Sequence, residues 1–145
     1  MPRHPPSTTN QSLDQLEHTQ WSAPTQDTYV TSNVYRLRRL PLNQYRIEDL
    51  RLMIGQQIGA AFLVPLALDH LELDPLAKGD FYPGDLVVAV TRLPDAFWRA
   101  HAHLIPNALR AIDAAIARIR IEDATDDLHE RLNEARDRFA KLTAA

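Results

Sequence analysis

Cysteine is absent from the 145 residues of this chain. Its absence excludes a disulfide framework, a thiolate nucleophile, a zinc–thiolate centre and an iron–sulfur cluster. A chain of this length buries roughly two-thirds of its unfolded surface in one domain, so it needs no such cross-link to be stable. The lack of cysteine also suits the reducing cytoplasm, where we expect this protein to work.

An excess of positive charge is missing as well, since 16 Lys and Arg stand against 19 Asp and Glu and give a net charge of −3. A dedicated nucleic-acid binder usually has a basic surface. The charge balance therefore predicts no nucleic-acid partner. It also makes a basic protein partner easier to accommodate than an acidic one.

Long apolar runs are missing too. The first twenty residues lack the apolar segment of an export signal. The longest uncharged run, residues 52–68, is just short of a membrane span and is interrupted by glutamines, two glycines and Pro65. We predict that this run forms two short core helices, separated near Gly55 and Gly59, and that the protein does not enter a membrane.

No arrangement of side chains in the sequence suits catalysis. His101 and His103 have the one metal-like spacing, but a zinc site usually needs three protein ligands, and a surface loop explains this pair better. Asp80 and Asp85 show no sign of the pocket or of the divergent pKa values that a catalytic carboxylate pair needs. The serines lie near the N-terminus outside any nucleophile motif, and no phosphate-binding loop is present. We predict no enzyme activity, no catalytic residue, no metal and no cofactor.

Apolar residues recur at helical spacing along most of the chain, and Ser12 is placed to cap a short helix before them. Residues 1–11 carry three prolines and little apolar surface, which predicts a disordered, mobile tail. The prediction is an all-α fold: a single compact multi-helix domain over residues 12–145 with a mobile N-terminal tail. The segments with the helical pattern are residues 27–40, 47–58, 60–72, 104–121 and 125–142.

Residues 86–90 are rich in valine and fit either a strand or a helix. We favour a helix that begins at Pro83, because proline is favoured in the first helical turn and Asp85 then lies near the positive end of the helix dipole.

Several side chains in or beside the predicted helices have an expected environment. Leu50 and Met53 belong to an apolar stripe and are expected in the core. Trp21 is expected to anchor the N-terminal segment by burying its indole. Arg38 lies near the C-terminal end of a predicted helix, where a cation complements the helix dipole.

Four stretches resemble a known protein family: YRLRRLPL (35–42), EDLRLMIGQ (48–56), LVPLAL (63–68) and GDFYPGD (79–85). They resemble the all-helical immunity proteins of bacterial contact-dependent growth inhibition (CDI) systems. The resemblance implies a cytoplasmic inhibitor, encoded directly after its toxin, that neutralises a cognate toxin C-terminal domain by stoichiometric occlusion. It further implies that the toxin is a nuclease, commonly an RNase. The ends of the chain carry no family signature, so cognate specificity is expected to reside there.

Acidic residues are concentrated between residues 69 and 95, where six acids stand against two bases and give a net charge of −4. Such a surface, with a second acidic cluster after residue 121, suits a basic nuclease by imitating the RNA backbone. Phe81 and Tyr82 are residue types that anchor interfaces, although both could equally be core residues beside helix-capping acids. The candidate partner-binding residues are Glu72, Asp74, Asp80, Tyr82, Asp85, Glu122, Asp123 and Asp126.

A helical protein-interaction adaptor or regulator that uses the same acidic surface is the alternative reading of the sequence. Gene order discriminates between the two, because an immunity protein is expected directly after a toxin reading frame.

Overall fold

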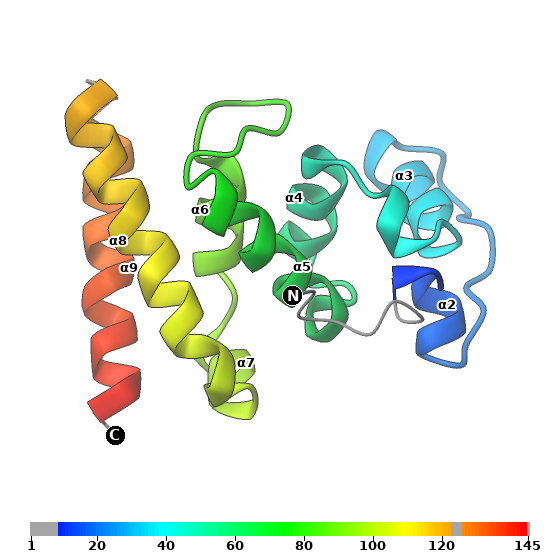
Figure 1. Cartoon of the computed structure of the whole chain (residues 1–145). Helices are drawn as coiled ribbons and strands as arrows, with labels where there is room; N and C mark the ends of the chain where they lie inside the picture. Colours follow the sequence, from blue (N-terminus) through cyan, green and yellow to red (C-terminus); the bar gives the residue numbers. More distant parts are fainter. Residues whose placement is uncertain (1–8, 123–125, 145) are drawn as a thin grey trace.

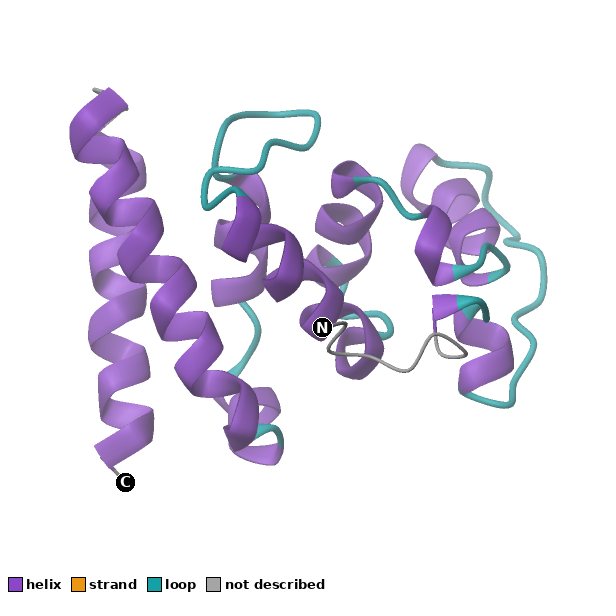
Figure 2. Ribbon diagram, in the orientation of Figure 1, coloured by secondary structure: helices purple, strands orange, loops and turns teal. Residues whose placement is uncertain are grey.

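The computed structural model describes residues 9–122 and 126–144, and side chains are not described for residues 120–122, 126 and 144. All regular elements in this part of the chain are helices (Figure 1, Figure 2), so the all-α prediction is confirmed. Two short 3₁₀ helices cover Leu42–Gln44 and Ala102–Leu104. The α-helices are α2 (Leu13–Leu16), α3 (Tyr29–Arg38), α4 (Ile47–Gly55), α5 (Ala60–Leu73), α6 (Asp85–Thr91), α7 (Asp95–Ala100), α8 (Ile105–Glu122) and α9 (Asp126–Ala144).

The helices pack side by side in a row (Figure 1). Helices α8 and α9 form a long hairpin at one end, α4, α5 and α6 form the middle, and α2 and α3 lie at the other end. Helix α4 contacts α3, α5 and α6, while α8 contacts α5 and α6. Leu50 and Met53 of α4 are fully buried in this core, as predicted.

Local sequence signals explain where the first helices begin. The Ser12 hydroxyl accepts the Gln15 N–H (3.3 Å), and the Gln15 side chain accepts the Ser12 N–H (2.8 Å). This reciprocal capping satisfies two backbone donors that a helix N-terminus leaves without partners. Thr28 and Thr31 cap α3 in the same way. The predicted capping role of Ser12 is confirmed.

The uncharged run of residues 52–68 is divided between α4 and α5, as predicted. Gly59 has φ of +66°, a left-handed conformation that favours glycine, and a Cβ there would lie 2.6 Å from Cδ1 of Leu13. The chain can therefore turn at Gly59 while α2 packs against the turn. Within the described residues, no helix is long and apolar enough to cross a bilayer.

The helix over residues 86–90 is confirmed, but its predicted start at Pro83 is wrong. Helix α6 begins at Asp85, because Gly84 precedes it with φ of +93°, outside the helical region. Pro83 instead belongs to the preceding loop, where it forms an isolated bridge with Lys78.

Arg38, rather than Trp21, anchors the N-terminal segment. Trp21 is 43% exposed, so its predicted burial is wrong. Arg38 is only 1% exposed, with Nε 2.7 Å from Asp14 Oδ1 and Nη2 2.6 Å from Glu17 Oε1. The Trp21 ring lies over this guanidinium at 4.3 Å. Arg38 thus joins α3 to α2 and its C-terminal end, a stronger role than complementing a helix dipole.

The expected N-terminal tail lies largely outside the described residues. Its last two residues have partners: the Gln11 carbonyl accepts the Leu42 N–H (3.0 Å), and the Asn10 side chain accepts from the Asn43 side-chain amide (2.9 Å). Mobility of the residues before them stays a prediction.

Candidate functional site

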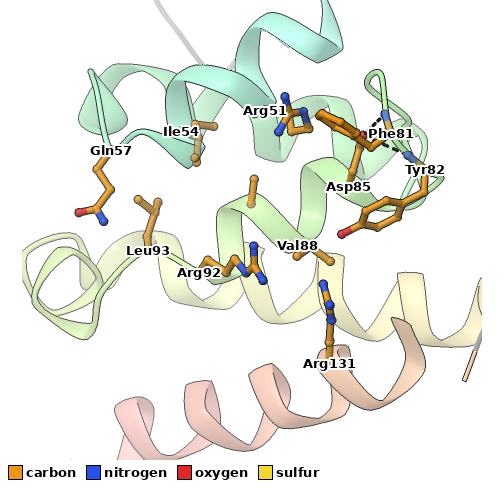
Figure 3. A pocket seen from close by; sticks show the side chains of 12 residues that line it. Arg51, Ile54, Gln57, Phe81, Tyr82, Asp85, Val88, Arg92, Leu93 and Arg131 are labelled. Carbon is orange, nitrogen blue, oxygen red and sulfur yellow. Dashed lines mark hydrogen bonds between the residues drawn. The ribbon is translucent and has the colours of Figure 1, made fainter. Parts of the chain in front are cut away.

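A buried carboxylate organises the loop between α5 and α6. Asp85, at the start of α6, is buried, and its side chain accepts N–H groups from Gly79 (2.6 Å), Phe81 (3.0 Å) and Tyr82 (3.3 Å). Two of these bonds are visible in Figure 3. Hydrogen bonds from three backbone amides replace the hydration that the Asp85 carboxylate loses on burial. Asp85 therefore holds the loop backbone in one conformation.

A second buried carboxylate, from α4, holds the same loop. Glu48 accepts the Asp80 N–H (2.8 Å) and pairs with Arg51, whose Nε lies 2.6 Å from Oε1. Burial is the largest influence on Glu48 and opposes ionisation, but the hydrogen bonds from Arg51 and Asp80, together with the positive charge of Arg51, lower the pKa of Glu48. The hydrogen bond to Glu48 in turn raises the pKa of Arg51. The guanidinium of Arg51 lies 4.5 Å from the centroid of the Phe81 ring.

Gly79 allows the loop to close on both carboxylates. A Cβ at this position would lie 2.5 Å from Oε1 of Glu48 and 3.1 Å from Oδ2 of Asp85. Any side chain would therefore displace at least one of the two acids from the loop. We refer to Glu48, Asp85 and the loop backbone that they bind, residues 79–82, as the carboxylate clamp.

The carboxylate clamp presents two aromatic side chains to solvent. Phe81 is 67% exposed and Tyr82 is 36% exposed, so neither is a core residue. Of the two roles considered from the sequence, the core role fails for the aromatics, and the Asp85 carboxylate binds loop amides that precede α6 instead of capping the helix. Their backbone is already fixed, which reduces the conformational entropy that a partner would have to remove on binding.

A groove of about 500 Å³ lies beside the loop, between α4, α6 and α9 (Figure 3). Apolar side chains of Ile54, Val88 and Leu93 line its base, and Tyr82 lies at its edge. Its cations are Arg51, Arg92 and Arg131, and we call it the arginine groove.

Three arginines line the arginine groove although the surrounding sequence is acidic. Asp85 is the one acid among the described residues that line it, and that carboxylate is turned toward loop amides. The net charge counted over residues 69–95 does not describe this groove, because Arg51 and Arg131 come from outside that segment.

The structure brings five of the predicted partner-binding residues to one region. Asp80, Tyr82 and Asp85 belong to the loop and its clamp, and Glu72 and Asp74 are exposed at the end of α5, where the loop begins. Asp85 holds the loop from inside, while the other four side chains lie at the surface. Their contact with a partner stays a prediction. Glu122, Asp123 and Asp126 have no described side chains, so that part of the prediction lies outside the described residues.

The histidine pair considered as a metal site has other neighbours. His101 stacks on Phe97 with ring centroids 4.4 Å apart, and its Nδ1 lies 2.9 Å from the Phe97 carbonyl oxygen. Across the described ranges, no group of three or more His, Asp or Glu residues is placed to hold a metal ion.

Sequence reasoning missed the arginine groove and the inward orientation of Glu48. The spacing of Glu48 and Arg51, three residues apart on a helix, indicated a pair. Arg131, by contrast, reaches the groove from α9, far along the chain from Arg51 and Arg92. No local pattern indicates that these three side chains meet.

Acidification tests the carboxylate clamp. We expect the stability of the wild type to fall more than that of a Glu48→Gln variant between about pH 5 and pH 3. The pKa of Glu48 is lowered by folding, so its stabilising contribution is present above the ordinary value of 4.5 and is lost as the pH falls through the folded-state pKa. Urea unfolding at each pH measures this difference. Parallel pH profiles for the two proteins would contradict the role given to Glu48.

Comparison with known families identifies one match. Residues 15–108, about two-thirds of the chain, match a family model described as CDI immunity proteins. The matched region contains α3 to α7, the carboxylate clamp, and the α4 and α6 walls of the arginine groove. No curated protein and no solved structure matches the chain.

Proposed function

The chain belongs to the CDI immunity proteins, non-enzymatic inhibitors that neutralise a cognate CDI toxin, and we propose that it does so in the cytoplasm by covering the catalytic surface of a nuclease toxin, most simply an RNase. One immunity protein binds one toxin domain. Inhibition then needs no chemistry from the immunity protein, because a covered active site cannot admit its substrate.

The observation that carries this proposal is the pair of exposed aromatics on a fixed loop. Phe81 and Tyr82 lie beside a groove with an apolar base and arginines at its edge. Protein interfaces are enriched in aromatic and arginine side chains, and tight ones concentrate their binding energy in a few such anchors. A loop already held by two buried carboxylates loses little entropy on binding. These properties support the loop as the centre of the toxin-binding surface.

The acids around the loop support a basic partner. Asp74 and Asp80 are exposed on the loop, and Glu72 is exposed on the last turn of α5. A nuclease binds a polyanion and therefore presents cations at its active site. Exposed acids of the immunity protein would attract those cations and speed association.

A titration of RNA cleavage tests the proposed function. The toxin domain encoded upstream of this chain is incubated with a labelled RNA and increasing amounts of the immunity protein. Cleavage should fall linearly and end at one equivalent of inhibitor. A toxin that cleaves no nucleic acid would overturn the nuclease assignment, and cleavage that persists at excess inhibitor would overturn direct occlusion.

Reversing one surface charge on the loop should weaken toxin binding. We expect Asp80→Lys to reduce the affinity for the toxin about tenfold. The loss should come mainly from slower association, because charges at the edge of an interface chiefly affect the rate of encounter. The fold should be unaffected, since the clamp uses the backbone N–H of Asp80 and not its exposed carboxylate.

Asp137→Lys is the matched control, because Asp137 is an exposed acid on α9 that does not line the groove. Association rates are measured by stopped flow at low and physiological salt. Equal rates for the two variants would remove Asp80 from the interface.

A further inference from the structure

Among the described residues that line the arginine groove, cations outnumber acids by three to one, the reverse of the charge balance of the whole chain. We propose that it receives an acidic segment of the toxin, with an Asp or Glu side chain placed beside an apolar one. This inference rests on the proposed function and adds the chemistry of one part of the toxin surface: a basic toxin domain that also presents a carboxylate to this groove.

Arg92 is the cation that is available for a partner. It follows the last residue of α6 and is exposed, and its side chain has no ion pair or hydrogen bond to the described residues. Figure 3 shows its guanidinium within the groove, between Leu93 and Val88. An arginine in this position offers a planar pair of donors that matches a carboxylate.

Arg131 is a second available cation, facing the groove from α9 (Figure 3). Its Nε lies 3.1 Å from Oδ2 of Asp127, but the Asp127 side chain is 71% exposed. An ion pair so open to water is weak, and a partner carboxylate can replace it at little cost. Arg51 differs, because the buried Glu48 already neutralises it.

The base of the groove favours a protein segment over a nucleic acid. Ile54, Val88 and Leu93 are buried apolar residues that form part of this base. A volume of about 500 Å³ accommodates a few side chains of a partner. The chain carries a net charge of −3, which repels a polyanion at long range, whereas one carboxylate within an apolar segment fits both the base and the two cations.

The test compares two charge reversals in the full-length protein. Arg92→Glu should weaken binding to the upstream-encoded toxin domain about 30-fold, because it places a carboxylate opposite a carboxylate in a partly desolvated groove. Arg99→Glu, the same change at an exposed arginine of α7 outside the groove, should alter affinity less than twofold. Melting temperatures of both variants confirm that they fold.

A charge exchange then locates the partner group. Each Asp and Glu on the toxin surface is replaced singly by Lys, and one replacement should restore affinity for Arg92→Glu. Equal affinity of Arg92→Glu and Arg99→Glu would overturn this inference while leaving the proposed function intact. Failure of the wild type to bind the toxin would overturn the proposed function and this inference with it.

Two further results would also overturn the acidic-segment inference. The first is that no toxin substitution restores binding to Arg92→Glu. The second is that the immunity protein alone binds a labelled RNA oligonucleotide and loses this binding in Arg92→Glu, which would make the groove a nucleic-acid site.

Discussion

Replacing Phe81 and Tyr82 together by alanine is expected to weaken toxin binding by about 100-fold or more while leaving the melting temperature nearly unchanged. Neither side chain belongs to the buried core, so their removal creates no internal cavity. The hydrogen bonds that fix the loop use their backbone N–H groups and survive the change. The loss therefore falls on the interface and not on the fold. Isothermal calorimetry with the toxin domain measures the effect.

Tyr29→Ala serves as the control for this double variant. Tyr29 is an exposed aromatic at the start of α3 that does not line the arginine groove. Its removal should leave affinity within about twofold of the wild type. If the double variant binds as tightly as Tyr29→Ala, the 79–85 loop is not the anchor of the interface, and the toxin contacts another face of the molecule.

Replacing Trp98 by alanine should destabilise the fold by about 3–5 kcal/mol, the largest effect expected of a single substitution here. Trp98 of α7 is fully buried and packs edge-on against Phe139 of α9, with ring centroids 4.8 Å apart. It also packs against Phe97 at 5.1 Å. Truncation leaves a cavity between α7 and α9 that the surrounding helices cannot fully close.

Trp21→Ala is the matched comparison, because it removes the only other tryptophan. Trp21 is partly exposed and contributes a cation–π contact with Arg38, so the expected loss is about 1 kcal/mol or less. Urea unfolding of the two variants gives both free energies. Equal losses would mean that Trp98 is less important to the core than its burial indicates.

Sequence patterns predicted the helices well because the signals for them are local. Ser12 lies next to the helix that it caps, Gly59 marks the turn between α4 and α5, and Leu50 and Met53 repeat at helical spacing. The burial of each tryptophan is not a local property. Trp98 is buried because it meets Phe139 from a distant helix, whereas Trp21 stays partly exposed over the charged side chain of Arg38.

Part of the candidate site could be predicted because its residues are neighbours in the sequence, and the rest could not because it depends on contacts between distant helices. The loop, its aromatics and its acids are consecutive in the sequence and were identified together. Counting charge along residues 69–95 nevertheless could not indicate the arginine groove, since two of its cations lie outside that segment. The Asp85 carboxylate is turned inward to the loop amides, and Arg131 arrives from α9. Only the packing of separate helices determines which charges remain available to a partner.

The central claim is that this chain neutralises its toxin by binding it directly through a charged surface. Calorimetric titration of the immunity protein into its cognate toxin domain, at low and at physiological salt, tests it most directly. The predicted result is 1:1 binding of nanomolar affinity that weakens as salt increases, because the exposed charges are screened. Absence of detectable binding at both salt concentrations would contradict the claim.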